Sequence, residues 1–255
     1  MMKELNLIYF SPTGSTNRVV NEIAKGISST TINEIDITYT GVSKSITGTI
    51  IIGSPVYEGR LPKVFKERLS HLDLTDANCI LVVVYGNRAY ENSLKELKEL
   101  VESKGATVWG AGAFIGEHSL SSKEKPIAEA RPDKKDLSIA FDFGKRIQAI
   151  NITKLKTIEI PGQYPLPESK PKPDVIIKTD ENKCIKCDKC IDACPVGAIP
   201  KDNPLVTNGT LCLRCCACIK VCPVDARELN DPLSLNIAKR VFENCQQRKE
   251  PEIFI

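Results

Sequence analysis

The residues best suited to chemistry are two runs of four cysteines in the C-terminal third of the chain, each followed by a proline. Both runs have the spacing Cys-x2-Cys-x2-Cys-x3-Cys-Pro, which bacterial proteins use to bind [4Fe–4S] clusters. The cysteines of the first run are Cys184, Cys187, Cys190 and Cys194, and those of the second run are Cys212, Cys215, Cys218 and Cys222. The pattern therefore predicts two [4Fe–4S] clusters and one-electron redox chemistry.

The spacing also predicts how the two runs share their ligands. Three closely spaced thiolates can cover one face of a cubane cluster, but the chain cannot turn back fast enough to supply the fourth. In two-cluster proteins with this spacing, the fourth cysteine of each run ligates the other cluster. We expect one cluster on Cys184, Cys187, Cys190 and Cys222, and the other on Cys212, Cys215, Cys218 and Cys194. Structural zinc is the alternative, because zinc also binds Cys-x2-Cys pairs, whereas disulfides suit such tight loops poorly.

Composition limits the class of protein. The chain has 255 residues, of which 42% are hydrophobic, and this suffices for one large or two modest domains. The apolar stretch Leu5–Phe10 is too short for a signal-peptide core or a membrane span, so we expect a cytoplasmic protein of an oxygen-poor cell. The formal charge of +3 counts cysteines as neutral, and two thiolate-bound clusters would make it negative. Since no basic tract alternates with aromatic residues, we expect no nucleic-acid partner.

The elements before the cysteine runs follow an α/β pattern, in which apolar runs alternate with amphipathic ones from residue 5 to about residue 150. Strands are expected at Leu5–Phe10, Asn33–Tyr39, Thr49–Gly53, Cys79–Tyr85 and Thr107–Phe114. Helices are expected at about Ser15–Ser28, Leu61–His71, Asn92–Lys104 and Lys134–Ile150. Five short apolar strands separated by helices predict a doubly wound, five-stranded parallel sheet.

The loop after the first strand is suited to binding a phosphate. It contains several hydroxyl groups and one glycine, and it leads into the N-terminus of a helix, where backbone N–H groups and the helix dipole attract anions. Its candidate ligand residues are Ser11, Thr13, Gly14, Ser15, Thr16 and Asn17. The loop lacks the Gly-Lys-Ser/Thr ending of a Walker motif. A plain Ser/Thr helix cap is the alternative interpretation.

The stretch Leu7–Thr16 resembles the phosphate loop of flavodoxins, which bind FMN. Segments 53–62 and 85–91, which follow the third and fourth strands, resemble flavodoxin loops that hold the flavin ring. This resemblance implies that these loops contribute to FMN binding through Pro55, Val56, Tyr57, Gly59, Arg60, Gly86, Asn87, Arg88 and Tyr90. Tyr57 and Tyr90 are candidates to stack on the ring, although loop tyrosines are as often half-buried packing residues. Val20 departs from the resemblance, because a small alanine is usual there.

The whole chain resembles the flavodoxin–ferredoxin fusion proteins of anaerobic bacteria and archaea. The resemblance implies one FMN, two [4Fe–4S] clusters, and a flavodoxin-like domain followed by a small α+β ferredoxin domain. We expect the boundaries 1–154 for the first domain, 155–174 for a semi-rigid, proline-rich linker, and 175–255 for the second domain. Asn208-Gly209 predicts a tight hairpin, and Leu233–Gln247 predicts a closing helix. The resemblance does not identify a redox partner, and the chain is expected to be a monomer or a homodimer.

The connection from residue 115 to residue 132 is long for an α/β domain, and such loops tend to be functional. We expect His118 or Arg131 to approach the flavin's pyrimidine edge, where a positive group would stabilise a reduced, anionic flavin. The alternative is a surface histidine and a structural ion pair. Three cysteines lie outside the cluster sets: Cys79 is expected in the sheet core, Cys216 as packing near a cluster, and Cys245 as an inert residue.

The sequence favours an electron carrier that couples one-electron steps on the clusters to one- or two-electron steps on FMN, serving outside redox proteins. The alternative is a reductase of a small substrate, such as a quinone, a nitroaromatic, a disulfide or a metal ion, bound over the flavin. A redox sensor or an assembly factor is a third class that no feature of the sequence favours. A pocket over the flavin would favour the reductase, and a flavin edge buried against a cluster would favour the carrier.

Overall fold

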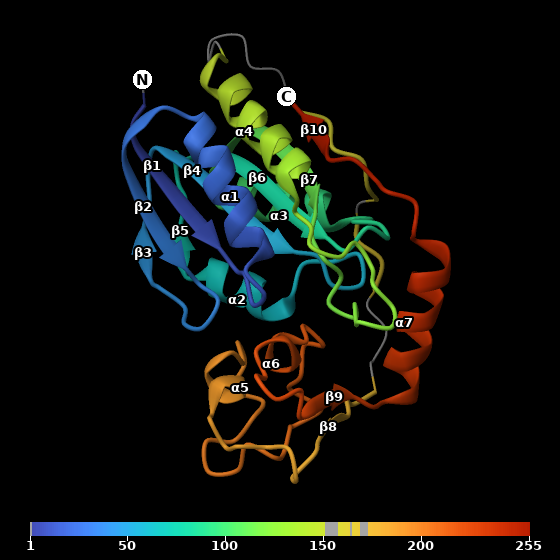
Figure 1. The fold of residues 1–255 in the computed structure, drawn as a ribbon. Coiled ribbons are helices and arrows are strands. Elements are labelled where there is room, and N and C mark those ends of the chain that lie inside the picture. Colours follow the sequence, from blue (N-terminus) through green and yellow to red (C-terminus); the bar gives the residue numbers. More distant parts are fainter. Residues whose placement is uncertain (1, 151–157, 164, 169–172) are drawn as a thin grey trace.

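The computed structural model describes residues 2–150, 158–163, 165–168 and 173–255, which form two units (Figure 1). The first unit is built on five parallel strands: β1 (Met2–Tyr9), β2 (Ser29–Asp36), β4 (Thr49–Pro55), β6 (Asn78–Tyr85) and β7 (Thr107–Ile115). Their spatial order, β2-β1-β4-β6-β7, is that of flavodoxin-like sheets. The predicted doubly wound parallel sheet is confirmed, although β2 begins four residues before the predicted strand.

Helices cover both faces of this sheet. α1 (Ser15–Gly26) and α4 (Lys134–Gln148) bury their apolar residues against one face, while α2 (Lys63–Ser70) and α3 (Ser93–Glu102) bury theirs against the other. Because both faces are covered, β6 is buried from its second residue to its last, as central parallel strands are. The short strands β3 (Lys44–Ser45) and β5 (Leu72–Asp73) pair separately at the periphery.

The second unit has little regular structure. It contains the antiparallel strands β8 (Ile177–Thr179) and β9 (Arg227–Leu229), the single-turn helices α5 (Lys189–Asp192) and α6 (Ala217–Lys220), and the longer α7 (Pro232–Asn244). A small apolar cluster centred on Val175, Ile177, Ile199 and Cys218 forms much of its interior. A core of this size stabilises a unit poorly unless bound metal adds to it.

The predicted hairpin at Asn208-Gly209 is wrong, because residues 205–212 form no strands. The Asn208 side chain instead accepts the backbone N–H groups of Thr210 and Leu211 at 3.1 and 3.3 Å, which makes a local side-chain turn. The Gly209 carbonyl accepts the N–H of Val175 at 3.2 Å. The backbone groups needed for a two-stranded ladder therefore have other partners. The predicted closing helix is present as α7, which ends three residues early.

The C-terminus returns to the first unit. β10 (Glu252–Phe254) pairs antiparallel with β7 and adds a sixth strand at that edge of the sheet (Figure 1). The last residues therefore belong structurally to the first unit, whereas the sequence assigned 175–255 to the second. In the predicted linker, Ile158 and Ile160 are buried in the first unit's core. The expected boundary at 154 and 155 lies outside the described residues. Among the described residues, no helix has the length and apolar character needed to cross a membrane.

Candidate functional site

The loop between β1 and α1 has the local geometry of an anion site. Gly14, at the helix N-cap, has a φ of 81° and leaves α1 without a side-chain cap or an acidic residue in its first turn. The Ser11 hydroxyl accepts the N–H of Asn17 at 3.0 Å, and the N–H of Ser11 donates to the Thr38 hydroxyl at 2.8 Å. The N–H groups of Ser15 and Thr16 have no partner within the described part of the chain. A rigid loop therefore presents free donors at the positive end of a helix dipole.

An open cavity lies beside this loop at the carboxyl ends of the strands, where ligands bind in open α/β sheets. Nine predicted flavin-site residues line it: Ser11, Thr13, Ser15, Thr16, Pro55, Val56, Tyr57, Gly86 and His118. The residues that prediction missed are Pro12, Val84, Tyr85, Gly116, Glu117, Ser119 and Cys215. Hydroxyl and N–H donors at one end and an aromatic ring at the other fit a phosphorylated flavin.

Seven predicted flavin-site residues do not line the cavity: Gly14, Asn17, Gly59, Arg60, Asn87, Arg88 and Tyr90. The Tyr90 hydroxyl donates to Glu252 of β10 at 2.8 Å, and the Asn87 side chain donates to two backbone carbonyls between α7 and β10. Arg88 pairs with Glu91 at 2.6 Å. Tyr90 and Asn87 therefore attach the C-terminal segment, while Gly14 and Asn17 shape the loop before α1.

Arg60 supports the loop that holds Tyr57. Its guanidinium binds the buried Glu96 carboxylate through two hydrogen bonds of 2.9 and 3.0 Å, and Lys66 binds the same carboxylate at 2.7 Å. The N–H of Leu61 donates to Glu96 as well, at 3.0 Å. Burial opposes ionisation of Glu96, but these partners outweigh it and lower the pKa of the carboxyl. Glu96 therefore fixes the 57–61 loop to α3.

His118 lines the cavity as a neutral donor, not as the expected cation. Burial, followed by the nearby Arg88 and Lys220 charges, lowers the pKa of His118 to about 4. Its Nδ1 accepts the N–H of Leu120 at 3.0 Å, so the proton of the neutral ring lies on Nε2. The low pKa disfavours a positive charge at His118, while its approach to the flavin stays a prediction. A hydrogen-bond donor remains available to the cavity.

Arg131 is a structural ion pair. Its side chain is buried, pairs with the fully buried Asp136 with its Nε at 2.8 Å from Oδ2, and donates to Asn87. It does not line the cavity. The expectation that Arg131 approaches the flavin is wrong, because this carboxylate holds and neutralises its charge.

The two cysteine runs adopt the same backbone path, displaced by 28 residues in the sequence. Positive φ values recur in the pairs Lys186 and Arg214 (52° and 54°), Asp188 and Cys216 (59° and 57°), and Gly197 and Asp225 (61° and 49°). The N–H groups of Ala198 and Ala226 each lie 3.2 Å from the sulfur of the fourth cysteine in their run. Two loops with one conformation are suited to binding the same kind of group twice.

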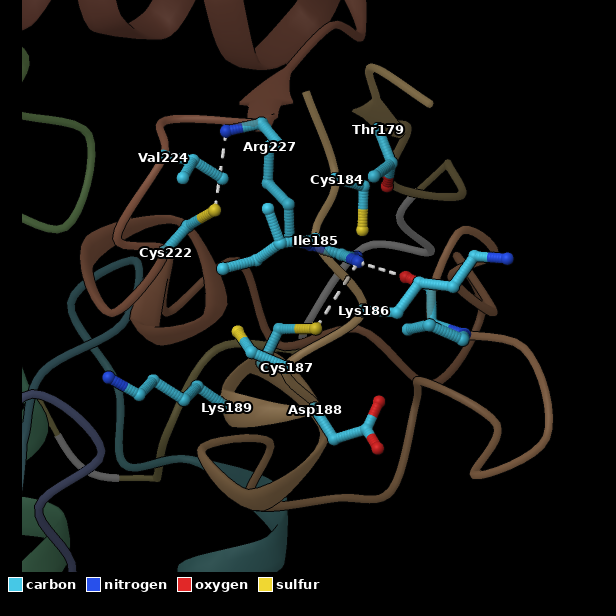
Figure 2. Close-up of a pocket in the computed structure, with 13 residues that line it drawn as sticks. Thr179, Cys184, Ile185, Lys186, Cys187, Asp188, Lys189, Cys222, Val224 and Arg227 are labelled. Atoms are coloured by element: carbon cyan, nitrogen blue, oxygen red, sulfur yellow. Dashed lines mark hydrogen bonds between the residues drawn. The ribbon is translucent and has the colours of Figure 1, made fainter. Parts of the chain in front are cut away.

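The cysteines gather in two groups, whose members are those of the predicted ligand sets. Cys184, Cys187, Cys190 and Cys222, here called the outer sulfur group, line one cavity (Figure 2). The inner sulfur group comprises Cys194, Cys212, Cys215 and Cys218. Burial, together with neighbouring thiolates that include Cys194, raises the pKa values of the other three inner cysteines. Ligation itself stays a prediction.

The donor set suits a cubane better than a single ion. Four-coordinate zinc needs sulfur atoms about 4 Å apart, because each Zn–S bond is about 2.3 Å long. Within the described ranges, no three His, Cys, Asp or Glu side chains are placed to hold one metal ion. Four cysteines at the spacing of each run are the usual ligands of a four-iron cluster.

The inner sulfur group lies against the flavin-site cavity. Cys215 belongs to this group and also lines the cavity, and Tyr57 packs on the cluster formed by Ala193, Cys215 and Ala217. Burial raises the pKa of Tyr57 well above its ordinary value, and Cys215 makes the largest charge contribution to this increase. The two candidate sites are therefore in direct contact through protein side chains.

Polar contacts hold the two units in this arrangement. Lys220 pairs with Glu117 at 2.6 Å and Lys123 with Asp225 at 2.9 Å, while Arg68 donates to the Pro195 carbonyl at 2.7 Å. No local pattern in the sequence indicates these pairs, because the partners lie about a hundred residues apart.

Comparisons with known proteins found similarities to segments of this chain. The family described as "4Fe-4S binding domain" matches residues 177–199. A component of an ion-translocating oxidoreductase complex from Pasteurella multocida is 40% identical over 75 residues, which is 29% of this chain and 36% of that protein. The match thus spans about a third of the relative.

Two solved flavodoxins are also similar. Flavodoxin 1 from Bacillus cereus is 22% identical, with a TM-score of 0.43, over 60% of this chain and all of that one. Megasphaera elsdenii flavodoxin is 20% identical, with a TM-score of 0.39, over 56% of this chain and 98% of that one. The strand order of the first unit is flavodoxin-like, and residues 177–199 match a [4Fe–4S]-binding domain. The chain therefore joins a flavodoxin-like domain to a [4Fe–4S]-binding unit, an architecture for electron transfer.

Proposed function

We propose that this protein passes electrons between two [4Fe–4S] clusters and FMN, and so couples one-electron redox proteins to two-electron flavin chemistry. The observation that carries the proposal is Cys215, which belongs to the inner sulfur group and lines the flavin-site cavity. Bound clusters supply one-electron transfer, and bound FMN supplies steps of one or two electrons. Contact between the two sites is what electron transfer within one chain requires.

The residues of the first unit bind and orient the flavin. Ser11, Thr13 and the free N–H groups of Ser15 and Thr16 hold the phosphate. Tyr57 packs against the ring, on the side of the inner sulfur group. The Nε2–H of His118 donates to a ring acceptor, and a neutral donor there stabilises added negative charge less than a cation would.

The outer sulfur group is the contact point for an outside protein. Cys187 is exposed, and the neighbouring Ile185 is 60% exposed. In the inner group, Cys215 and Cys218 are buried instead. The outer group would therefore hold the cluster that exchanges electrons with an outside protein, and the inner group would hold the cluster next to the flavin site. Cysteines that bind [4Fe–4S] clusters must stay out of disulfides, which favours a reducing compartment, so we place the protein in the cytoplasm.

A reductase acting on a small substrate has no specific support. Such an enzyme needs open space over the flavin ring, whereas Tyr57 and Cys215 occupy one side of the cavity. We therefore favour the carrier.

Removal of Cys215 tests the proposal. The Cys215→Ala variant loses or alters the inner cluster and keeps the FMN site, so flavin reduction by a reduced bacterial ferredoxin should slow at least about tenfold. Anaerobic stopped-flow absorbance, with iron, sulfide and FMN contents determined beforehand, measures this. Cys216→Ala is the matched control, because Cys216 is equally buried but belongs to neither sulfur group. Equal flavin reduction rates in both variants, or a chain that binds no FMN, would contradict the proposal.

A further inference from the structure

The two cysteine repeats differ in charge at one buried position. The 28-residue offset that relates the runs also relates Ile199 to Arg227, which are 3% and 4% exposed. One repeat therefore buries an apolar side chain where the other buries a guanidinium. Burying a charge is costly unless something nearby compensates it, so the partners of Arg227 are informative.

The partners that Arg227 has do not neutralise it. Its Nη1 donates to the Pro204 carbonyl at 2.6 Å and lies 3.7 Å from Cys190 Sγ, and its Nη2 donates to the Thr207 hydroxyl. Its Nε is buried without a partner in the described part of the chain. No carboxylate of the described residues forms an ion pair with it. The Arg227 guanidinium thus has a positive charge and a free N–H donor that an anionic group could bind.

That partner lies in the cavity of the outer sulfur group. Arg227 lines this cavity together with all four outer cysteines, and Figure 2 shows its head group between the sulfur-bearing side chains. Thr179 lines the same cavity, and its hydroxyl is likewise buried without a partner among the described residues. Two unpaired donors therefore face the place where a cluster on these cysteines would lie.

We propose that Arg227 sets the reduction potential of the outer cluster and makes it easier to reduce than the inner one. This inference rests on the proposed function. An added electron makes a cluster more negative, and a buried cation and N–H donors near its sulfurs stabilise that charge. Arg227 also interacts with Cys218 of the inner group, through its charge and a side-chain hydrogen bond, and its charge acts on Cys212. Since Arg227 lines the cavity of all four outer cysteines, the inner potential should move in the same direction by less. The outer cluster is therefore the first to be filled.

Removing the charge should shift the potentials unequally. In Arg227→Gln, the ratio of reduced to oxidised outer cluster at a fixed potential should fall at least about tenfold, equal to 59 mV for one electron. The inner cluster should move by less than half of this, and Arg227→Lys should keep most of the wild-type value. Lys189→Gln is the matched control, because Lys189 lines the same cavity but is exposed, and water screens its charge.

An anaerobic redox titration of the full chain carrying its cofactors measures these values. The cysteine β-proton NMR signals assign each step to a cluster through its own ligands. Equal shifts of the two clusters, no shift in Arg227→Gln, or a shift of the same size in Lys189→Gln would overturn the inference. Should Arg227→Gln lose iron, Arg227→Ile decides, because it places the residue of the other repeat at this position and removes the charge; an unchanged outer potential in that variant would also overturn the inference. Failure of the wild-type chain to bind clusters would instead refute the proposed function.

Discussion

Gly53 and Val20 provide a quantitative test of how α1, and with it the phosphate loop, is held against the sheet. A Cβ atom at position 53 in β4 would lie 2.5 Å from Val20 Cγ1 and 2.9 Å from Thr16 Cγ2. Val20 is 0% exposed and Thr16 is 2% exposed, so neither methyl group has free space to enter. Gly53→Ala must therefore push α1 away from β4, and overpacking of this kind costs about 1–3 kcal/mol.

The two positions should be strongly coupled. Val20→Ala alone removes two buried methyl groups and costs about 2 kcal/mol. In the double variant, the new methyl group at position 53 fills part of the vacated space, while Thr16 still crowds it. We expect a total cost of about 2 kcal/mol, and hence a coupling energy of about 2 kcal/mol, against about 0.5 kcal/mol for independent sites.

Denaturant unfolding followed by fluorescence measures this coupling, because the single tryptophan, Trp109, is 5% exposed in β7. Gly48→Ala is the control: its φ is +79°, and a Cβ there would meet nothing within 4 Å. It should cost about 1 kcal/mol through the backbone alone, and that cost should add to the cost of Val20→Ala. Additive costs for Gly53→Ala and Val20→Ala would refute the packing argument.

Three further perturbations follow from the structure. The folded protein lowers the pKa of His118 to about 4, whereas an unfolded histidine titrates near 6.5. Between these pH values the unfolded chain binds more protons, so the free energy of unfolding should fall by at most about 3 kcal/mol as the pH decreases from 6.5 to 4. Denaturation measured at several pH values should show that His118→Gln removes this part of the pH dependence. Glu96→Gln leaves Arg60 and Lys66 without their carboxylate and should lower the free energy of unfolding by about 2 kcal/mol. A fluorescence titration should also show weaker FMN binding. An unchanged free energy of unfolding would show that the two ion pairs contribute nothing to stability. Deletion of residues 248–255 removes β10 and should accelerate cleavage by trypsin, whereas Ile255→Ala, at an exposed position, should not; equal cleavage rates would contradict the role of the C-terminal strand.

The parts of the protein that were predictable from sequence depend on short-range patterns. The cysteine spacing within each run restricts the backbone to one loop conformation, and the apolar runs of β4 and β6 identify strands buried on both faces. The phosphate loop was also recognisable, because its hydroxyls directly precede the helix that they serve.

The features that prediction missed depend on partners distant in the sequence. Tyr90 and Asn87 resemble flavin-loop residues, but their partners lie about 160 residues later, in the C-terminal segment. β10 is only three residues long and follows a proline, so it has no recognisable period. The replacement of Ile199 by Arg227 between the repeats was readable in the sequence, but its burial and its place beside the outer cysteines were not.

The return of β10 to the first sheet has a consequence for biosynthesis. A ribosome makes this strand after the cysteine loops, so the flavodoxin-like sheet lacks one edge until residues 252–254 have been added. Domains generally begin to fold from the N-terminus during translation, and the five parallel strands can do so. The edge of β7 stays uncovered in the meantime, and an uncovered edge can pair with other chains. A nascent chain that stops before residue 252 therefore exposes this edge, and the pairing of residues 252–254 with β7 closes it.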